Sequence, residues 1–202
     1  MVENWAYTDV LKEHFFNPKN FLKSQKEVQE FSKKANGYGI AGNPVCGDVM
    51  EIWLRIENNR IKEFKWRTYG CAAAIAVTSM LSVMLTENSG MSIDEARLLT
   101  PQKIISKLVA LPSAKVHCAV LGNQALQAAL NYYFRKNSQF DKIVPLAGKI
   151  LDEKLKITEK EIEDLIKSGV KEIKQLEEKI GAKIEDQKTI QKIKNILKKY
   201  GK

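Results

Sequence analysis

Hydrophobic and polar side chains alternate with a changing period along the chain, and each change of period predicts an element. Residues 50–57 alternate with a period of two, which is typical of a strand, and Asn58 and Asn59 then predict a turn. Residues 60–69 resume the strand pattern, so the two runs predict a hairpin. Residues 71–86 and residues 114–135 carry small and apolar side chains at helical spacing, which indicates two long buried helices.

Local start and stop signals add shorter helices around this hairpin. Residues 8–16 predict a helix that ends at Asn17 and Pro18, because proline has no N–H and disfavours helix in the preceding residue. Ser92 and Glu95 have the spacing of a capping box, which predicts another helix start. Strands gathered early and helices gathered late indicate an α+β domain.

Charge divides the chain near residue 140. Residues 1–140 carry 29 charged side chains, whereas the much shorter segment 141–202 carries 28. Every cysteine, histidine and tryptophan lies in the first segment. The second segment repeats Ile and Leu at helical spacing in three short runs, the first of them opened by a capping box at Thr158 and Glu161. We therefore expect two domains, residues 1–140 with the chemistry and residues 141–202 as a small all-helical tail.

Composition excludes several classes of protein. With 202 residues and 44% hydrophobic content, the chain suits one core of about 100–150 residues with a segment appended to it. Three cysteines cannot form the even, dense disulfide set of a small secreted scaffold, and the N-terminus has no basic region before an apolar run. The longest apolar stretch, residues 71–85, is shorter than the ~20 residues that cross a bilayer. We expect a cytoplasmic protein that is not bound to a membrane.

The net charge of +9 raises nucleic-acid binding as a hypothesis, since basic proteins bind phosphate polymers through counterion release. The basic residues are interleaved with acidic ones throughout, and the sequence contains no known nucleic-acid motif. We therefore expect no nucleic-acid partner.

The residues that suit metal chemistry are three cysteines, one histidine and one aspartate, each at or beside an expected transition between elements. They are Cys46, Asp48, Cys71, His117 and Cys118. A thiol at a helix start is favoured as a thiolate by unpaired N–H groups and by the positive end of the helix dipole. Three thiolates with a histidine or an aspartate suit either tetrahedral Zn²⁺ or iron in a [2Fe–2S] cluster. Each cysteine taken alone is equally well explained as a small buried hydrophobe, and no CxxC pair is present.

Three ordered motifs carry a resemblance to a known family. The segments GNPVCGDVM at residues 42–50, YGCAAAIA at residues 69–76 and LPSAKVHC at residues 111–118 resemble the signature segments of the NifU/IscU iron–sulfur cluster scaffold proteins. Residues 7–20 also resemble the N-terminal segment of that family, so the resemblance covers about residues 5–136. It implies a small antiparallel β-sheet covered by helices, in agreement with the α+β class expected from the patterns.

The resemblance implies a role for each of the five residues. Cys46, Cys71 and Cys118 would receive persulfide sulfur and ligate a transient [2Fe–2S] cluster. Asp48 would promote iron entry and cluster release, and either His117 or Asp48 would be the fourth ligand. Zn²⁺ would occupy the same site when no cluster is present. A cysteine desulfurase would supply sulfur, a ferredoxin would supply electrons and apo iron–sulfur proteins would receive the cluster, which describes a scaffold and not an enzyme.

Two departures from the family pattern stand out. The family segment before His-Cys usually reads LPPVK and binds a dedicated Hsp70-type chaperone, whereas this chain has LPSAK, with Leu111, Pro112 and Lys115 in common. The resemblance therefore implies a chaperone site at these three residues that has lost the rigidity of one proline. The second departure is GCAAA at residues 70–74 in place of GCGSA, and small side chains persist there.

The tail resembles the helical [2Fe–2S] module of longer NifU proteins and of bacterioferritin-associated ferredoxin. That module needs one pair of cysteines before its first helix and another pair after its second. The corresponding stretches, residues 151–156 and 183–188, contain none, which excludes a permanent cluster in the tail because Lys and Ile cannot replace thiolates. We expect a cysteine-free remnant that serves docking or oligomerisation, with a homodimer or a higher oligomer both open.

The resemblance is also compatible with a second function. A zinc protein of a related branch would accept and relay persulfide sulfur from a cysteine desulfurase without assembling a cluster. His117 beside Cys118 is typical of the cluster-building branch and favours the scaffold.

Overall fold

The computed structural model describes residues 7–44 and 46–200, so Val45 of the first motif lies outside the described residues. The strands are β1 (Gly37–Gly42), β2 (Val49–Glu57), β3 (Arg60–Tyr69), β4 (Ile150–Asp152) and β5 (Ile157–Thr158). The helices are α1 (Asp9–Phe16), α2 (Gln25–Ser32), α3 (Ala72–Thr86), α4 (Ile93–Ala96), α5 (Pro101–Lys107), α6 (Val116–Lys136), α7 (Glu159–Lys167), α8 (Ile173–Ile180) and α9 (Gln187–Tyr200). Two 3₁₀ turns, η1 (Ser113–Lys115) and η2 (Phe140–Lys142), flank α6.

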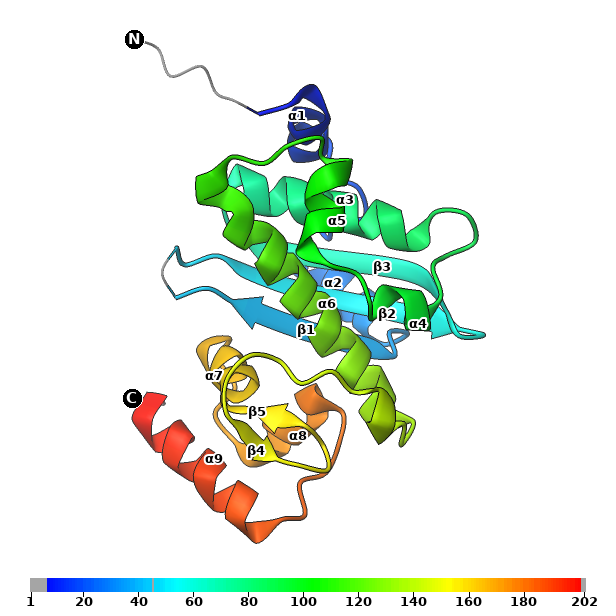
Figure 1. The fold of residues 1–202 in the computed structure, drawn as a ribbon. Helices are drawn as coiled ribbons and strands as arrows, with labels where there is room; N and C mark the ends of the chain where they lie inside the picture. The colour runs from blue at the N-terminus through cyan, green and yellow to red at the C-terminus, as the bar shows by residue number, and fades with distance from the viewer. Residues whose placement is uncertain (1–6, 45, 201–202) are drawn as a thin grey trace.

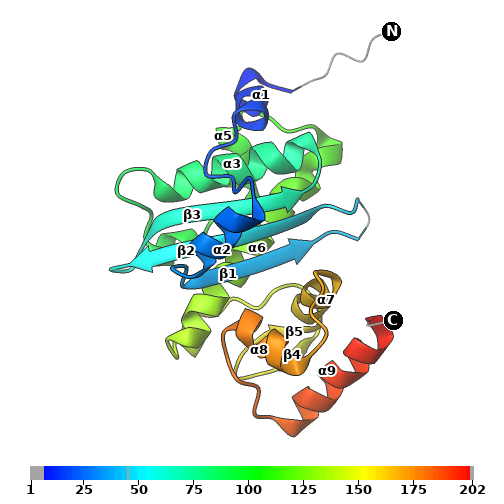
Figure 2. The same cartoon turned by 180° about the vertical axis from the view of Figure 1, so that it is seen from behind.

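The first three strands form an antiparallel sheet in the order β1-β2-β3. The expected hairpin is confirmed, and Asn58 and Asn59 turn it with φ of 50° and 62°, a conformation that asparagine tolerates better than most residues. Helices α3 and α6 lie across one face of this sheet, and α2 lies on the opposite face (Figures 1 and 2). This arrangement confirms the expected α+β class with a small antiparallel sheet covered by helices.

The side chains of β1 alternate between the two faces of the sheet. A Cβ atom on Gly39 would lie 2.3 Å from the carbonyl oxygen of Ala125, so only glycine allows α6 to pack against this strand at backbone distance. Tyr38 and Ile40 point to the other face and are buried there with Trp53 of β2. Both faces of the sheet are therefore covered, although β1 lies at its edge.

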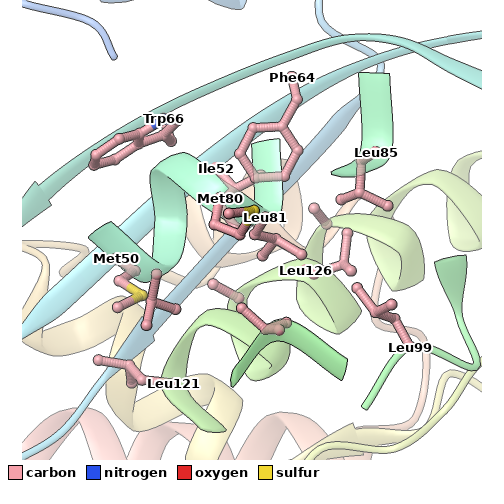
Figure 3. Close-up of a cluster of buried hydrophobic side chains, with 14 of the residues drawn as sticks. Met50, Ile52, Phe64, Trp66, Met80, Leu81, Leu85, Leu99, Leu121 and Leu126 are labelled. Carbon is pink, nitrogen blue, oxygen red and sulfur yellow. The ribbon is translucent and has the colours of Figure 1, made fainter. Parts of the chain in front are cut away.

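The first core fills the space between the sheet and helices α3 and α6. Figure 3 shows Met50 and Ile52 of β2 and Phe64 and Trp66 of β3 facing Leu81 of α3 across this space. These strand residues are fully buried. Burial of this apolar surface is the main favourable contribution to the free energy of packing α3 and α6 against the sheet. It thereby fixes the positions of the helix N-termini that carry Cys71 and Cys118.

A second core lies on the opposite face and crosses residue 140. Tyr38, Ile40 and Trp53 belong to it together with Ile162 of α7 and Ile180 of α8. Figure 2 shows α7 and α8 beside β1. The division into domains 1–140 and 141–202 stays a prediction, while the packing shows that the tail shares a core with the sheet. No helix in the described part of the chain is both long enough and apolar enough to span a bilayer.

Three elements go beyond what the sequence patterns predict. Strand β1 reads GYGIAG and has too many glycines for a strand signal, and α2 is a short helix in a polar stretch. The tail is not all-helical, because β4 and β5 pair as a small antiparallel hairpin. Strands of three and two residues are too short to show a period of two.

Candidate metal centre

The loop between β1 and β2 carries Cys46 and Asp48. Its base is closed by a hydrogen bond of 2.9 Å from the Asn43 N–H to the Asp48 carbonyl, and the Gly47 N–H donates to the Asn43 carbonyl over 2.9 Å. Gly47 has φ of 75°, which glycine adopts without strain. Cys46 is exposed on this loop, whereas Asp48 is 5% exposed and turned inward.

Asp48 lies against the start of α3. Its Oδ1 accepts a hydrogen bond of 3.2 Å from the N–H of Cys71, which is the N-cap residue of that helix. This carboxylate thus takes the place of a capping side chain at an end where unpaired N–H groups favour negative charge. The same contact places the Cys71 sulfur beside the loop of Cys46.

The glycine before Cys71 makes this approach possible. A Cβ atom on Gly70 would lie 2.9 Å from Cβ of Ala74 and 3.1 Å from Cγ of Asp48. Both distances are shorter than ordinary contacts between carbon atoms, which lie near 3.5–4.0 Å. The glycine of the second motif therefore has a steric reason: it leaves room for the carboxylate.

Cys118 reaches the same point from the first turn of α6. It is fully buried, its Sγ lies 3.7 Å from Sγ of Cys71, and its S–H donates toward Oδ2 of Asp48 over 3.8 Å. Two sulfurs bound tetrahedrally to one zinc at ~2.3 Å would lie about 3.8 Å apart. The spacing of these two free thiols already fits a shared ion, while a disulfide would need about 2.05 Å.

The five residues expected from the sequence form two overlapping groups. Ligand atoms of Asp48, Cys71 and Cys118 lie within 4.8 Å of one another, and so do those of Cys46, Asp48 and His117. Asp48 belongs to both groups, so it links the pair Cys71 and Cys118 to the pair Cys46 and His117, and each pair includes one half-buried residue, Cys71 and His117. Within the described residues, no group with mutual distances under 4.8 Å contains Cys46 together with Cys71 or Cys118. Asp48 is the residue that the groups of all three cysteines share.

His117 has a buried ring nitrogen, Nε2, that lacks a hydrogen-bond partner in the described part of the chain. A buried nitrogen of this kind costs free energy unless it is bound. One ring nitrogen of His117 lies within 4.8 Å of the ligand atoms of Cys46 and Asp48, and imidazole nitrogen is a common metal ligand.

Electrostatics around the buried thiol oppose its ionisation in the metal-free state. Burial raises the pKa of Cys118 well above the ordinary thiol value, and the neighbouring Cys71 and Asp48 raise it further. Lys115 acts in the opposite direction, and the proximity of Cys71 raises the pKa of the Lys115 ammonium. A bound cation would remove this penalty, because it stabilises the thiolate directly.

The residues expected to bind a chaperone are only partly accessible. Leu111 is buried in the first core, and Pro112 and Lys115 are half-buried around η1. Ser113 and Ala114 are the exposed residues of this segment.

Sequence reasoning missed two residues near the thiols. It gave Lys115 no role at the metal site, although this ammonium interacts with Cys71 and Cys118. It also missed Tyr7, which packs against the first core and whose pKa is raised by burial and then by Cys71. For Lys115, its position two residues before the His117-Cys118 pair was a signal that it could lie near the thiols. For Tyr7, no local pattern indicated a position near the cysteines.

Known proteins resemble this chain over the part that holds the site. The scaffold protein IscU 1 for iron–sulfur cluster assembly of Archaeoglobus fulgidus is 42% identical over 140 residues, which cover 69% of this chain and 84% of that relative. The corresponding IscU protein of Aquifex aeolicus is 35% identical over 151 residues, 74% of this chain and 87% of its own length. A putative scaffold protein for the SUF system of Fervidobacterium islandicum has a crystal structure that matches with a TM-score of 0.46 and 19% identity over 61% of this chain and 96% of its own.

The family model described as the NifU-like N-terminal domain matches residues 6–140, the region that contains all three motifs and both groups of ligand atoms. The tail lies beyond this match. This chain belongs to the NifU-like N-terminal domain family.

Proposed function

We propose that this protein is a scaffold on which a [2Fe–2S] cluster is assembled from iron and sulfur and from which the cluster passes to apo-proteins. The observation that carries the proposal is the approach of the Cys71 and Cys118 sulfurs to 3.7 Å beside Asp48. Two thiols at ligand spacing, with Cys46 and His117 grouped around the same carboxylate, suit a cluster that enters and leaves. The relatives from Archaeoglobus and Aquifex are named as scaffolds of this kind.

Sulfur enters the proposed cycle at a cysteine of the site. A cysteine desulfurase carries sulfur as a persulfide, and attack by a thiolate of this chain moves the outer sulfur atom onto it while the donor leaves as a thiolate. Cys46 suits this step because it is exposed, whereas Cys118 is fully buried. Each persulfide then takes up two electrons to give sulfide and a free thiolate, and a ferredoxin is the proposed donor of these electrons.

The ligand set of the bound cluster follows from the two groups. Cys46, Cys71 and Cys118 supply thiolates, and His117 or Asp48 supplies the fourth ligand. A carboxylate is a hard oxygen donor and binds iron–sulfur centres less strongly than thiolate does. Asp48 therefore promotes iron entry and cluster release. Zn²⁺ fits the same donors and occupies them when no cluster is present.

The proposed role is transfer and not turnover of an organic substrate. The sulfurs act as acceptors and ligands and are regenerated when the cluster leaves, so we classify the protein as a non-enzyme. Cys71 and Cys118, whose sulfurs lie 3.7 Å apart, would readily form a disulfide under oxidising conditions. The protein therefore needs a reducing compartment such as the cytoplasm to keep both thiols free. Apo iron–sulfur proteins are the recipients. Any Hsp70-type chaperone contacts Ser113 and Ala114 more readily than buried Leu111.

Anaerobic reconstitution tests this function. Purified protein is mixed with ferrous iron, cysteine and a cysteine desulfurase, and the visible absorption of a [2Fe–2S] cluster is followed. We expect the absorption to develop in wild type and in the control Ser113→Ala, and to be lost in Cys71→Ser and Cys118→Ser. Tight zinc binding without any cluster absorption would contradict the scaffold and favour a zinc protein that only relays persulfide sulfur.

A further inference from the structure

Helix α7 of the tail reaches the strand that leads into the cysteine loop. Figures 1 and 2 both show α7 beside the end of β1. The Lys160 ammonium of this helix donates a hydrogen bond of 2.8 Å to the carbonyl oxygen of Gly42, the last residue of β1. The two residues are 118 positions apart in the sequence. This contact thus connects the tail to the start of the loop that holds Cys46.

The contact is held by a buried carboxylate. Lys160 forms an ion pair with Asp164 one turn further along α7, and the side chains of the two residues are 25% and 2% exposed. Asp164 also lies against the strand, because a Cβ atom on Gly42 would be 3.5 Å from its Oδ1. Burial raises the pKa of Asp164, and the ammonium of Lys160 opposes this shift. Lys160 and Asp164 are therefore both packed between α7 and the end of β1.

Gly42 lies directly before the hydrogen bond that closes the cysteine loop, so a contact at Gly42 can affect the position of the loop. The next residue, Asn43, donates the hydrogen bond to Asp48 that closes the base of the loop. A hollow of about 250 Å³ separates the loop from α6 at this point. Its lining includes Asn43, Pro44, His117, Gln124 and Lys160. The tail thus forms one wall of the space directly beside the candidate ligand His117.

We propose that Lys160 is a positioning residue of the metal centre, which fixes the end of β1 so that the Cys46 loop stays in ligand position. Residues 141–202 then regulate how long a metal or cluster is held, although the tail supplies no ligand. This inference rests on metal binding at the proposed site and goes beyond it, since the family match ends at residue 140.

The expected effect follows from the role of groups that orient ligands. Removing such a group typically weakens metal binding by about 10–100-fold. Lys160→Met keeps the apolar stem but removes the donors to Gly42. We expect Zn²⁺ to pass from the loaded full-length protein to a chromophoric chelator about tenfold faster than from wild type. Lys160→Arg keeps a cation at this place and restores most of the slow release.

Two further variants separate positioning from loss of stability. Lys167→Met is the control for loss of a lysine from the same helix, since Lys167 pairs with Glu163, whereas the hydrogen bond to Gly42 comes from Lys160. The double variant Lys160→Met/Asp164→Leu removes the buried charge pair as a unit, so that no unpaired carboxylate is left to unfold the tail. We expect it to release Zn²⁺ as fast as Lys160→Met, with a thermal midpoint closer to that of wild type.

The Cys46→Ser background tests whether the effect acts through the loop. With that ligand removed, the change Lys160→Met should no longer alter the rate of Zn²⁺ release, because the two residues act on one contact. Equal acceleration in both backgrounds would show a general loosening of the fold and would overturn the inference.

A readout without metal keeps the inference separate from the proposed function. Amide hydrogen exchange of metal-free protein should show faster exchange at Asn43 and Gly47 in Lys160→Met and unchanged exchange in the first core. If wild type bound no Zn²⁺, the proposed zinc occupancy of the site would fail, and this exchange would still decide whether Lys160 holds the loop. Unchanged exchange at both amides would overturn the inference.

Discussion

Arg135 of α6 and Glu161 of α7 form a buried ion pair with two parallel hydrogen bonds, of 2.6 Å from Nη1 to Oε1 and 3.0 Å from Nη2 to Oε2. The side chains are 0% and 7% exposed. The same guanidinium donates to the carbonyl oxygen of Leu155 over 2.9 Å. Arg135 therefore binds both α7 and the turn between β4 and β5, which connects the tail to α6.

Breaking this pair should destabilise the whole protein. Arg135→Met leaves the Glu161 carboxylate buried without its partner, and the loss expected for such a change is about 3–5 kcal/mol in the free energy of unfolding. Urea unfolding followed by circular dichroism measures it. The double variant Arg135→Met/Glu161→Leu is the control, because it removes the charge pair together and should recover much of the loss. A double variant no more stable than Arg135→Met would contradict this explanation.

Removing the tail should expose the second core. A fragment that ends at residue 140 keeps α2 but leaves Tyr38, Ile40 and Trp53 without the tail helices that share their core. Each such side chain contributes about 1.5–3 kcal/mol through burial. We expect the fragment to bind an apolar dye, to lose stability and to associate, as light scattering and dye fluorescence would report. A monomeric fragment as stable as the full chain would show that residues 1–140 form an independent domain.

The glycine before Cys71 gives a prediction about the site itself. Gly70→Ala places a methyl group too close to Asp48 and Ala74. Overpacking of this kind costs typically about 1–3 kcal/mol in stability. We also expect weaker Zn²⁺ binding, because the carboxylate must move away from Cys71. Ala72→Gly is the control, because it changes the same helix start, next to Cys71, without adding bulk. Gly169→Ala would not serve, because Gly169 has φ of 103° and an alanine there would be strained.

Stability should fall in acid because of His14. This residue is buried beside Ser79, with 2.7 Å between Nδ1 and Oγ, and burial followed by the charge of Lys19 lowers its pKa. The unfolded chain then binds a proton more readily than the folded protein, so stability is lost as the pH falls below about 6.5. Urea unfolding at about pH 7.5 and about pH 5.5 should show a smaller difference in His14→Gln than in wild type. Equal differences in the two proteins would exclude His14 as the cause.

Asp48 should shorten the life of the cluster. Asp48→Ala removes the oxygen donor next to Cys71 and Cys118, so a reconstituted cluster should decay more slowly in air or with a chelator than in wild type. The decay of visible absorption measures this lifetime. Faster loss than in wild type would contradict the assigned role of Asp48.

Much of the fold could be predicted from local patterns because its core elements obey them. The hairpin of β2 and β3 was evident from a period of two and two asparagines, and Ser92 and Glu95 do form a complete capping box. Thr158 and Glu161 have the same spacing, and Thr158 does accept from the Glu161 N–H. The Glu161 carboxylate however binds Arg135, a partner from α6 that no local pattern can reveal.

The sequence could name the candidate site residues, but it could not give their arrangement. The motifs singled out Cys46, Asp48 and Cys71 along the sequence, and only the fold shows that Asp48 belongs both to the group with Cys71 and Cys118 and to the group with Cys46 and His117. Contacts such as that of Lys160 with Gly42 join distant parts of the chain. They depend on how α7 packs against β1, which propensity and periodicity do not determine.

Cluster transfer tests the central claim most directly. Protein carrying a reconstituted [2Fe–2S] cluster is mixed anaerobically with an apo-ferredoxin in the presence of a chelator, the two proteins are separated, and iron and visible absorption are measured on each. The scaffold function predicts that the ferredoxin gains the cluster, that this chain returns to its free thiols, and that transfer is slower from Asp48→Ala. A cluster that stays on this chain while the ferredoxin remains without iron would contradict it.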